Sequence, residues 1–297
     1  MRVIVSGATG LIGSALVPAL KAAGHQPVAL VRRNPADGDI LWNPATGALP
    51  PGALEGADAV VHLAGAGIGD HRWTDEYKRE LVDSRVRSTT LLAEAIAAAT
   101  NGPKVFLSGS AIGFYGDRGE EQLDEASPAG DGFLADLCVQ WEGATAAASA
   151  AGARVAHLRT GIVLTPKGGA LAKMLPLFKL FAGGRFGNGR QWQSWISLPD
   201  EVGAILHLLS SDVHGPVNLT GPEPVTNQQF ARTLGDVLHR PSVLPVPRFG
   251  PSLLLGGELA DNLLFTGQRV LPRALQASGY SFQHGTLDVA LRAVLGR

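Results

Sequence analysis

Short apolar runs alternate with amphipathic stretches along the first 160 residues. The runs are rich in Val, Ile and Leu, as in strands buried on both faces of a parallel sheet. The strands are expected at 3–5, 27–31, 59–65, 105–108 and 154–159, with a shorter one at 39–42. Helical periodicity covers 11–20, 75–99 and 133–151. This alternation predicts an α/β fold, a Rossmann-type doubly wound parallel sheet with ligands at the carboxyl ends of its strands.

The character of the chain changes after Gly161, where glycines and aromatic residues become frequent. Helices are expected there at 169–182, 199–210, 227–239 and 286–295. We therefore predict a dinucleotide-binding domain over 1–165, to which a strand and helix from 195–220 return. Residues 166–297 form a smaller C-terminal substrate lobe with a family-specific tail.

A glycine-rich turn joins the first expected strand to the first helix, in the sequence Gly7-Ala8-Thr9-Gly10-Leu11-Ile12-Gly13. A strand, a glycine turn, a helix and a second strand form the context that a dinucleotide fingerprint requires. Gly7 permits the tight turn, Gly10 lets the backbone approach a pyrophosphate, and Gly13 lets the helix pack closely. The free N–H groups at the helix start favour phosphate.

The end of the second strand indicates which cofactor is bound. Arg32 and Arg33 stand where an acidic residue would bind the ribose hydroxyls of NAD, and no Asp or Glu follows before Asp37. Two guanidinium groups suit the 2′-phosphate of NADP(H) by charge and geometry. The alternative is a pair of solvated surface arginines.

Composition narrows the class of protein. The 297 residues are 45% hydrophobic with a net charge of −1, which favours neither nucleic acid nor an anionic membrane as a partner. The single cysteine, Cys138, excludes an internal disulfide and fits a cytoplasmic location. We expect no membrane span, because no apolar run approaches the length of one. We also expect no metal site, because no His, Cys or Asp cluster has the spacing of metal ligands.

The chain resembles the extended short-chain dehydrogenases/reductases, and more narrowly an atypical "epimerase family" that is NAD-dependent epimerase/dehydratase-like and has a C-terminal domain of unknown function. The resemblance rests on GATGLIG at 7–13, HLAG at 62–65, DSRVRST at 83–89, SGSAIGFYG at 108–116, RTGIVL at 159–164, GNGRQWQSWI at 187–196 and GPEPVTNQQF at 221–230. It covers nearly the whole chain and implies no particular substrate.

The resemblance implies a set of cofactor contacts. Pyrophosphate contacts fall on Gly7, Thr9, Gly10, Leu11, Ile12 and Gly13, and 2′-phosphate contacts fall on Arg32 and Arg33. The strand beside the adenosine and inner ribose ends in His62, Leu63, Ala64 and Gly65. Arg85 stands where many extended members have an Asn facing the site, with a surface ion pair to Asp83 or Glu80 as the alternative.

The catalytic Tyr-x-x-x-Lys pair of the superfamily is absent. Ser110 fits the position of the catalytic Ser, but Leu134 and Cys138 occupy the Tyr and Lys positions. The candidates for proton transfer are Tyr115, Cys138 and the carboxylates Asp117, Asp124 and Glu125, with a core role as the alternative for Tyr115 and Cys138. In the lobe, Gln191 is expected to orient a substrate carbonyl, and Trp195 either covers a substrate or lies in the core.

Three functions remain open: an NADP(H)-dependent oxidoreductase or epimerase-like enzyme, an NADP(H)-dependent sensor without turnover, and a scaffold stabilised by its cofactor. The expected partner is a small carbonyl or enone. We predict a monomer or a homodimer formed through the long helices at 75–99 and 133–151.

Overall fold

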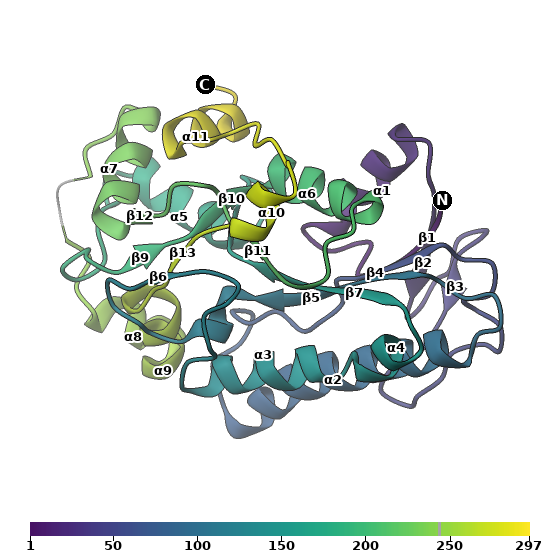
Figure 1. Ribbon diagram of the computed structural model, residues 1–297. Helices are drawn as coiled ribbons and strands as arrows, with labels where there is room; N and C mark the ends of the chain where they lie inside the picture. Colours follow the sequence, from purple (N-terminus) through teal and green to yellow (C-terminus); the bar gives the residue numbers. More distant parts are fainter. Residues whose placement is uncertain (243–244) are drawn as a thin grey trace.

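A seven-stranded parallel sheet forms the centre of the molecule, in the order β11-β7-β5-β4-β1-β2-β3. The computed structural model describes residues 1–242 and 245–297 (Figure 1). The strands of this sheet are β1 Arg2–Ser6, β2 Gln26–Val31, β3 Ile40–Leu41, β4 Ala59–His62, β5 Val105–Ala111, β7 Arg154–Thr160 and β11 Gly215–Leu219.

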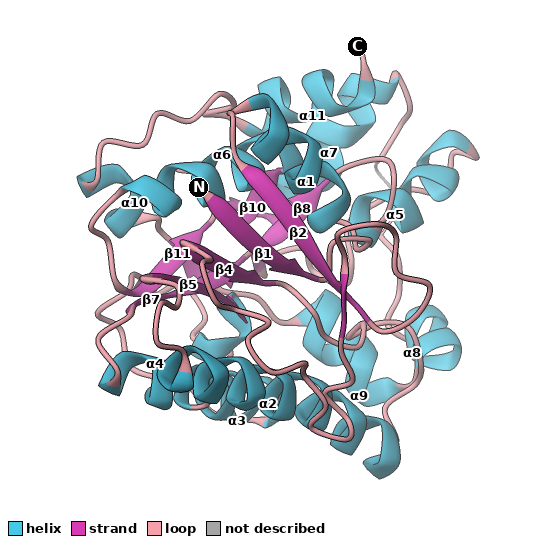
Figure 2. Cartoon of the chain, turned by 90° about the vertical axis from the view of Figure 1, so that its right-hand side faces the viewer, coloured by secondary structure: helices cyan, strands magenta, loops and turns pink. Residues whose placement is uncertain are grey.

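Helices cover both faces of the sheet, so the fold is the expected doubly wound α/β arrangement (Figures 1 and 2). One face carries α2 Asp75–Ala98, α3 Phe133–Gly143 and α4 Ala146–Ala150. The other carries α1 Gly13–Ala22, α6 Leu198–Ser210 and α10 Arg273–Ala277. Two apolar clusters fill the spaces between the sheet and these two layers.

The smaller lobe lies beyond the carboxyl edge of the sheet and has its own apolar cluster around Phe178, Trp195 and Phe230. Its helical elements are α5 Gly169–Lys179, α7 Asn227–Leu238, α8 Phe249–Leu255, α9 Gly257–Ala260, the π-helical turn η2 Asp261–Phe265 and α11 Leu287–Leu295. Its strand pairs are β8 Ile162–Leu164 with β10 Trp195–Ser197, β9 Trp192–Gln193 with β12 Val225–Thr226, and β6 Gln122–Leu123 with β13 Arg269–Val270.

Within the segment 195–220, the part that follows β10 returns to the main body of the fold. Its helix α6 packs beside α1, and its strand β11 pairs with β7 at the edge of the large sheet. The division of the chain at residue 165 stays a prediction.

The helix expected over 133–151 is interrupted in the structure. It ends at Gly143, and a short second helix begins at Ala146. The Thr145 hydroxyl donates a 2.7 Å hydrogen bond to the Glu142 carbonyl oxygen, so it competes with the helical backbone bond. Gly143 adds to the effect, because glycine is a weak helix former. The sequence pattern does not show the Thr145 contact.

Candidate functional site

The glycine turn between β1 and α1 is shaped to hold a phosphate group. At Gly13 an added Cβ would lie 2.2 Å from the Gly7 carbonyl oxygen, so only glycine fits there. Gly7 has a φ of +71°, in the left-handed region that glycine adopts without strain. An added Cβ at Gly10 would meet only the Gly7 carbonyl, so the outer side of Gly10 is open.

The start of α1 offers hydrogen-bond donors at this turn. No side chain caps the helix, and the backbone N–H groups of Leu11 and Ile12 have no hydrogen-bond partner within residues 1–242 and 245–297. Thr9 and Gly10 are exposed beside them. Uncapped N–H groups and the helix dipole at an exposed glycine turn fit the pyrophosphate of a dinucleotide. The residues present therefore fit this cofactor.

The two arginines after β2 lie on the same edge of the sheet as the glycine turn. Arg32 and Arg33 follow β2 directly and are exposed at the carboxyl edge of the sheet, one strand away from the turn after β1. Neither makes a hydrogen bond or ion pair in the described structure. Their guanidinium groups are therefore available to an anion.

At the end of β4, the imidazole of His62 is not available to a ligand, so only the backbone of this residue could contact one. The His62 ring is fully buried between the hydroxyls of Ser6 and Ser88. Burial, helped by the charge of Arg85, lowers the pKa of His62 to about 3, so the ring is neutral. The next residues, Leu63 and Ala64, are half-buried.

Arg85 points inward from α2, so the alternative of a surface ion pair with Asp83 or Glu80 is wrong. Its guanidinium donates to the backbone carbonyls of Leu81 and Ala66 and lies 5.0 Å from the centre of the Trp141 ring. It also packs over exposed Gly65, where an added Cβ would lie 3.3 Å from its Cζ. Arg87, one half-turn further on, pairs with Asp83 instead. Arg85 thus braces the loop that follows β4.

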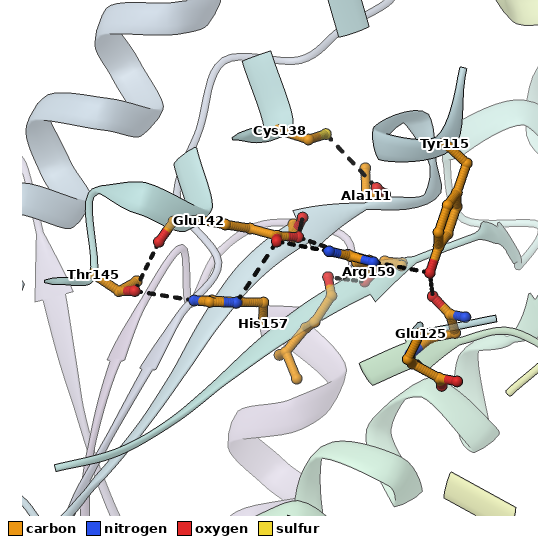
Figure 3. Close-up of polar contacts among 12 residues, drawn as sticks. Ala111, Tyr115, Glu125, Cys138, Glu142, Thr145, His157 and Arg159 are labelled. Atoms are coloured by element: carbon orange, nitrogen blue, oxygen red, sulfur yellow. Dashed lines mark hydrogen bonds and ion pairs between the residues drawn. The ribbon is translucent and has the colours of Figure 1, made fainter. Parts of the chain in front are cut away.

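Ser110 belongs to a buried polar network under the carboxyl edge of the sheet, whose members Glu142, Arg159 and Tyr115 are labelled in Figure 3. Its hydroxyl donates to Glu142 Oε1 at 2.6 Å, and Arg159 holds both oxygens of that carboxylate at 2.8 and 2.9 Å. Burial works to raise the pKa of Glu142, but Arg159 outweighs it and holds the pKa below its ordinary value. Because Ser110 gives its proton to this carboxylate, its oxygen faces a ligand only as an acceptor.

Tyr115 is the other end of this network. It is fully buried, its hydroxyl donates to Asn218 Oδ1 at 2.7 Å, and it accepts from Arg159 at 3.0 Å (Figure 3). Burial raises the pKa of Tyr115 to about 12, although Arg159 works to lower it. These contacts fit the core alternative for this residue better than proton transfer to a ligand.

Cys138 is equally withdrawn from solvent. Its side chain is 2% exposed, and Sγ lies 3.6 Å from the Ala111 carbonyl oxygen. Burial, followed by the charge of Glu142, raises the pKa of Cys138 to about 11. One turn earlier in α3, Leu134 packs on Gly113 and offers no polar group. The face of α3 that would carry Tyr-x-x-x-Lys is therefore apolar and contains a protonated thiol.

The side chains of the two lobe residues expected to contact substrate instead bond to other parts of the protein. The Gln191 amide donates to the backbone carbonyls of Phe186 and Leu264. Trp195 is buried in the apolar cluster of the lobe, and its indole N–H donates to the Glu223 carbonyl oxygen. Of the alternatives for Trp195, the structure supports the core position.

Sequence reasoning missed two members of the site: Arg159 and Asn218. Each is a polar residue within or beside an apolar run, which is a signal that a buried polar partner exists. The partner itself lies far away in sequence, as with Tyr115 and Asn218, so it could not be named from the pattern.

Comparisons with known proteins agree with this architecture. Residues 3–220 match the NAD dependent epimerase/dehydratase family, and residues 246–294 match a domain of unknown function, DUF1731. An epimerase family protein of Mycobacterium leprae is 46% identical over 97% of this chain and 94% of its own length.

Two solved structures that share more than a third of the sequence match over the whole chain. The crystal structure of the human epimerase family protein SDR39U1 (isoform 2) with NADPH has a TM-score of 0.91 and 36% identity and is covered in full. A nucleoside-diphosphate sugar epimerase from Corynebacterium glutamicum has a TM-score of 0.81 and 37% identity, and 58% of that chain is covered. No helix in the described ranges is long and apolar enough to cross a membrane.

Proposed function

Because the chain belongs to the NAD dependent epimerase/dehydratase family, we propose that it is an NADP(H)-dependent oxidoreductase that acts on a small, partly apolar carbonyl or enone. The observation that carries the proposal is the exposed, uncapped glycine turn at the carboxyl end of β1. Residues Gly7 to Gly13 hold the pyrophosphate, with Leu11 and Ile12 as backbone donors. The human relative that was crystallised with NADPH supports this choice of cofactor.

Selectivity for the phosphorylated cofactor comes from Arg32 and Arg33. Both side chains are exposed beside the glycine turn, and no carboxylate follows β2 to bind ribose hydroxyls. A 2′-phosphate can accept hydrogen bonds from both guanidinium groups. The loop that holds Leu63, Ala64 and Gly65, braced by Arg85, lines the adenosine side.

The substrate class follows from what the site lacks. Bound NADPH supplies a hydride. Abstraction of a proton from a sugar hydroxyl needs a positioned base, and Leu134 and Cys138 cannot serve as one. An enone or activated carbonyl makes a smaller demand, because its reduction needs only a proton donor for the developing oxyanion. Tyr115 and Cys138 stay candidate donors, but burial of both favours a different source.

NADPH oxidation with a panel of aldehydes, ketones and enones tests the proposal. We expect turnover of at least one small enone or carbonyl and none of a UDP-hexose. Epimerisation of a UDP-hexose at ordinary enzyme rates would contradict the proposed substrate class.

The second candidate function is an NADP(H)-dependent sensor. The burial of Tyr115, Cys138 and Ser110 favours it, since none of these groups is free to move a proton. Tight binding of NADPH in a fluorescence titration, without turnover of any probe, is the result expected of a sensor. Light scattering would decide between a monomer and a homodimer, and fractionation of the source cell would test a cytoplasmic location.

A further inference from the structure

A second carboxyl group lies under the carboxyl edge of the sheet, on the face opposite Glu142. Glu201 is in the first turn of α6 and is fully buried. Its Oε1 lies 2.9 Å from the hydroxyl of Thr160, and its Oε2 has no hydrogen-bond partner among the residues described. A buried carboxylate without a cation is costly, so this arrangement favours the neutral acid.

Thr160, the hydrogen-bond partner of this acid, lies beside the end of the strand that carries Ser110. It ends β7, is half-buried, and pairs with Ala111, the residue after Ser110 in β5. Side chains alternate along a strand, so Ser110 and Arg159 face α3 while Thr160 faces α6. The Thr160 hydroxyl is also 3.4 Å from the Leu158 carbonyl oxygen, which can accept its proton while Oε1–H of Glu201 donates to Thr160.

No described cation compensates Glu201. The elements packed on α6 include β5, β8 and β10, which carry no charged side chain, and α1, whose single charge, Lys21, is exposed.

The other ionisable groups nearby do not neutralise it either. Arg159 of β7 is bound to Glu142 on the other face, Asp200 is held by Ser197 and His284, and the Tyr280 phenol contacts the same turn. Burial raises the pKa of Glu201 to about 8, although the hydrogen bond with Thr160 works to lower it.

We propose that Glu201 stores the proton for the reduction and delivers it to the substrate through the Thr160 hydroxyl. The inference rests on the proposed function, because it needs a carbonyl or enone at this edge of the sheet. Thr160 is the group that touches the substrate, and Glu201 acts through it.

The substrate carbon gains hydride from bound NADPH, and its oxygen gains the proton as the Thr160 O–H bond breaks. The Thr160 oxygen takes the proton of Glu201, which is left as a carboxylate and is protonated again from water. The two carboxyl groups thus have different states: Arg159 keeps Glu142 ionised, and burial keeps Glu201 neutral.

The first test is infrared spectroscopy of the NADPH complex at pH 7. We expect the C=O stretching band of a protonated carboxylic acid, shifted in D₂O and absent from Glu201→Gln. The matched control is Glu94→Gln, which changes an exposed glutamate of α2. Thr160→Val should keep the band, since it leaves the acid in place. Absence of the band from the wild-type protein would overturn the proposal.

The second test is NADPH oxidation with cyclohex-2-en-1-one and hexanal as probes, measured from pH 6 to pH 9. Glu201→Gln keeps a hydrogen bond to Thr160 but has no proton to give, so kcat should fall roughly 10²-fold or more. The wild-type rate should decline as pH rises through the pKa of about 8, and this decline should be absent from the variant. Thr160→Val should match Glu201→Gln, and Thr160→Ser should restore activity.

NADPH affinity separates the possible failures. We expect the Kd for NADPH to change less than about twofold in all these variants, since neither residue is a proposed cofactor contact. Unchanged kcat and pH profile in Glu201→Gln would overturn the proton-supply role and leave the proposed function standing. A wild-type protein that binds NADPH but turns over neither these probes nor the wider panel would overturn both. Loss of NADPH binding in Glu201→Gln would indicate a structural role and overturn the proposal.

Discussion

Replacement of Arg159 by Met tests the buried network that connects α3, β5 and β7. Arg159 makes two hydrogen bonds to Glu142 and one to Tyr115, and its guanidinium lies 3.5 Å from the centre of the Phe114 ring. Met keeps an apolar stem against that ring but removes the positive charge. Glu142 then loses its cationic partner, and the His157 ring 3.7 Å away does not replace it at pH 7, because burial lowers the pKa of His157.

The expected loss of folding stability follows from this uncompensated charge on Glu142. Removing one partner of a buried ion pair typically costs about 3–5 kcal/mol. The Glu142 side chain is 11% exposed, so water can reach it and the lower end of that range applies. A loss of about 3 kcal/mol lowers the Tm of a domain of this size by roughly 6–12 °C.

Chemical denaturation at pH 7, together with calorimetry, measures the effect. Arg87→Met is the matched control, because Arg87 pairs with Asp83 on the surface, with side chains 58% and 51% exposed. Such exposed pairs contribute about 0.5 kcal/mol. The double variant Glu142→Gln/Arg159→Met should recover part of the loss, since no buried charge remains.

The loss should also depend on pH. In the wild-type protein the pKa of Glu142 is lowered, so its contribution to stability is present above the unfolded-state pKa and disappears as pH falls through the folded-state value. Without Arg159, only Ser110 and His157 still favour the ionised form of Glu142 against burial, so the carboxyl protonates more readily. The deficit of Arg159→Met should therefore shrink between pH 7 and roughly pH 4. A variant as stable as wild type, or a deficit that grows on acidification, would refute this reasoning.

Two further predictions concern the glycine turn and the thiol. Gly13→Ala places a Cβ 2.2 Å from the Gly7 carbonyl oxygen, so we expect a loss of about 1–3 kcal/mol and at least roughly tenfold weaker NADPH binding, measured by denaturation and fluorescence. Gly143→Ala is its control, because an added Cβ there meets nothing within 4 Å; equal effects of the two changes would contradict the steric argument. Cys138, with its pKa raised to about 11, should react with a thiol reagent only after unfolding, and rapid labelling of the folded protein would disprove its burial.

Much of the fold could be predicted from the pattern of apolar residues. The alternation of short Val- and Ile-rich runs with helices identified the parallel sheet, because strands covered on both faces need apolar side chains throughout. The glycine turn was equally visible, since the spacing of Gly7, Gly10 and Gly13 reflects local backbone geometry that nearby residues determine.

The polar network could not be predicted in the same way. Tyr115 meets Asn218 across 103 positions of the chain, and Ser110 meets Glu142 across 32. No local rule connects such pairs, which depend on strand register and on the face that each side chain takes. The same applies to Trp195, whose burial follows from the packing of α7 and α11 around it rather than from its neighbours in sequence.

The central claim is that the exposed turn after β1 and the arginines after β2 together bind NADP(H). Calorimetric titration of NADPH and NADH into the wild-type protein and into Arg32→Ala/Arg33→Ala tests it most directly. At a conservative 1.4 kcal/mol for each exposed arginine, the double variant should bind NADPH about 100-fold more weakly and NADH almost unchanged. Equal affinity of the wild-type protein for the two cofactors, or a parallel loss of both in the variant, would contradict the account.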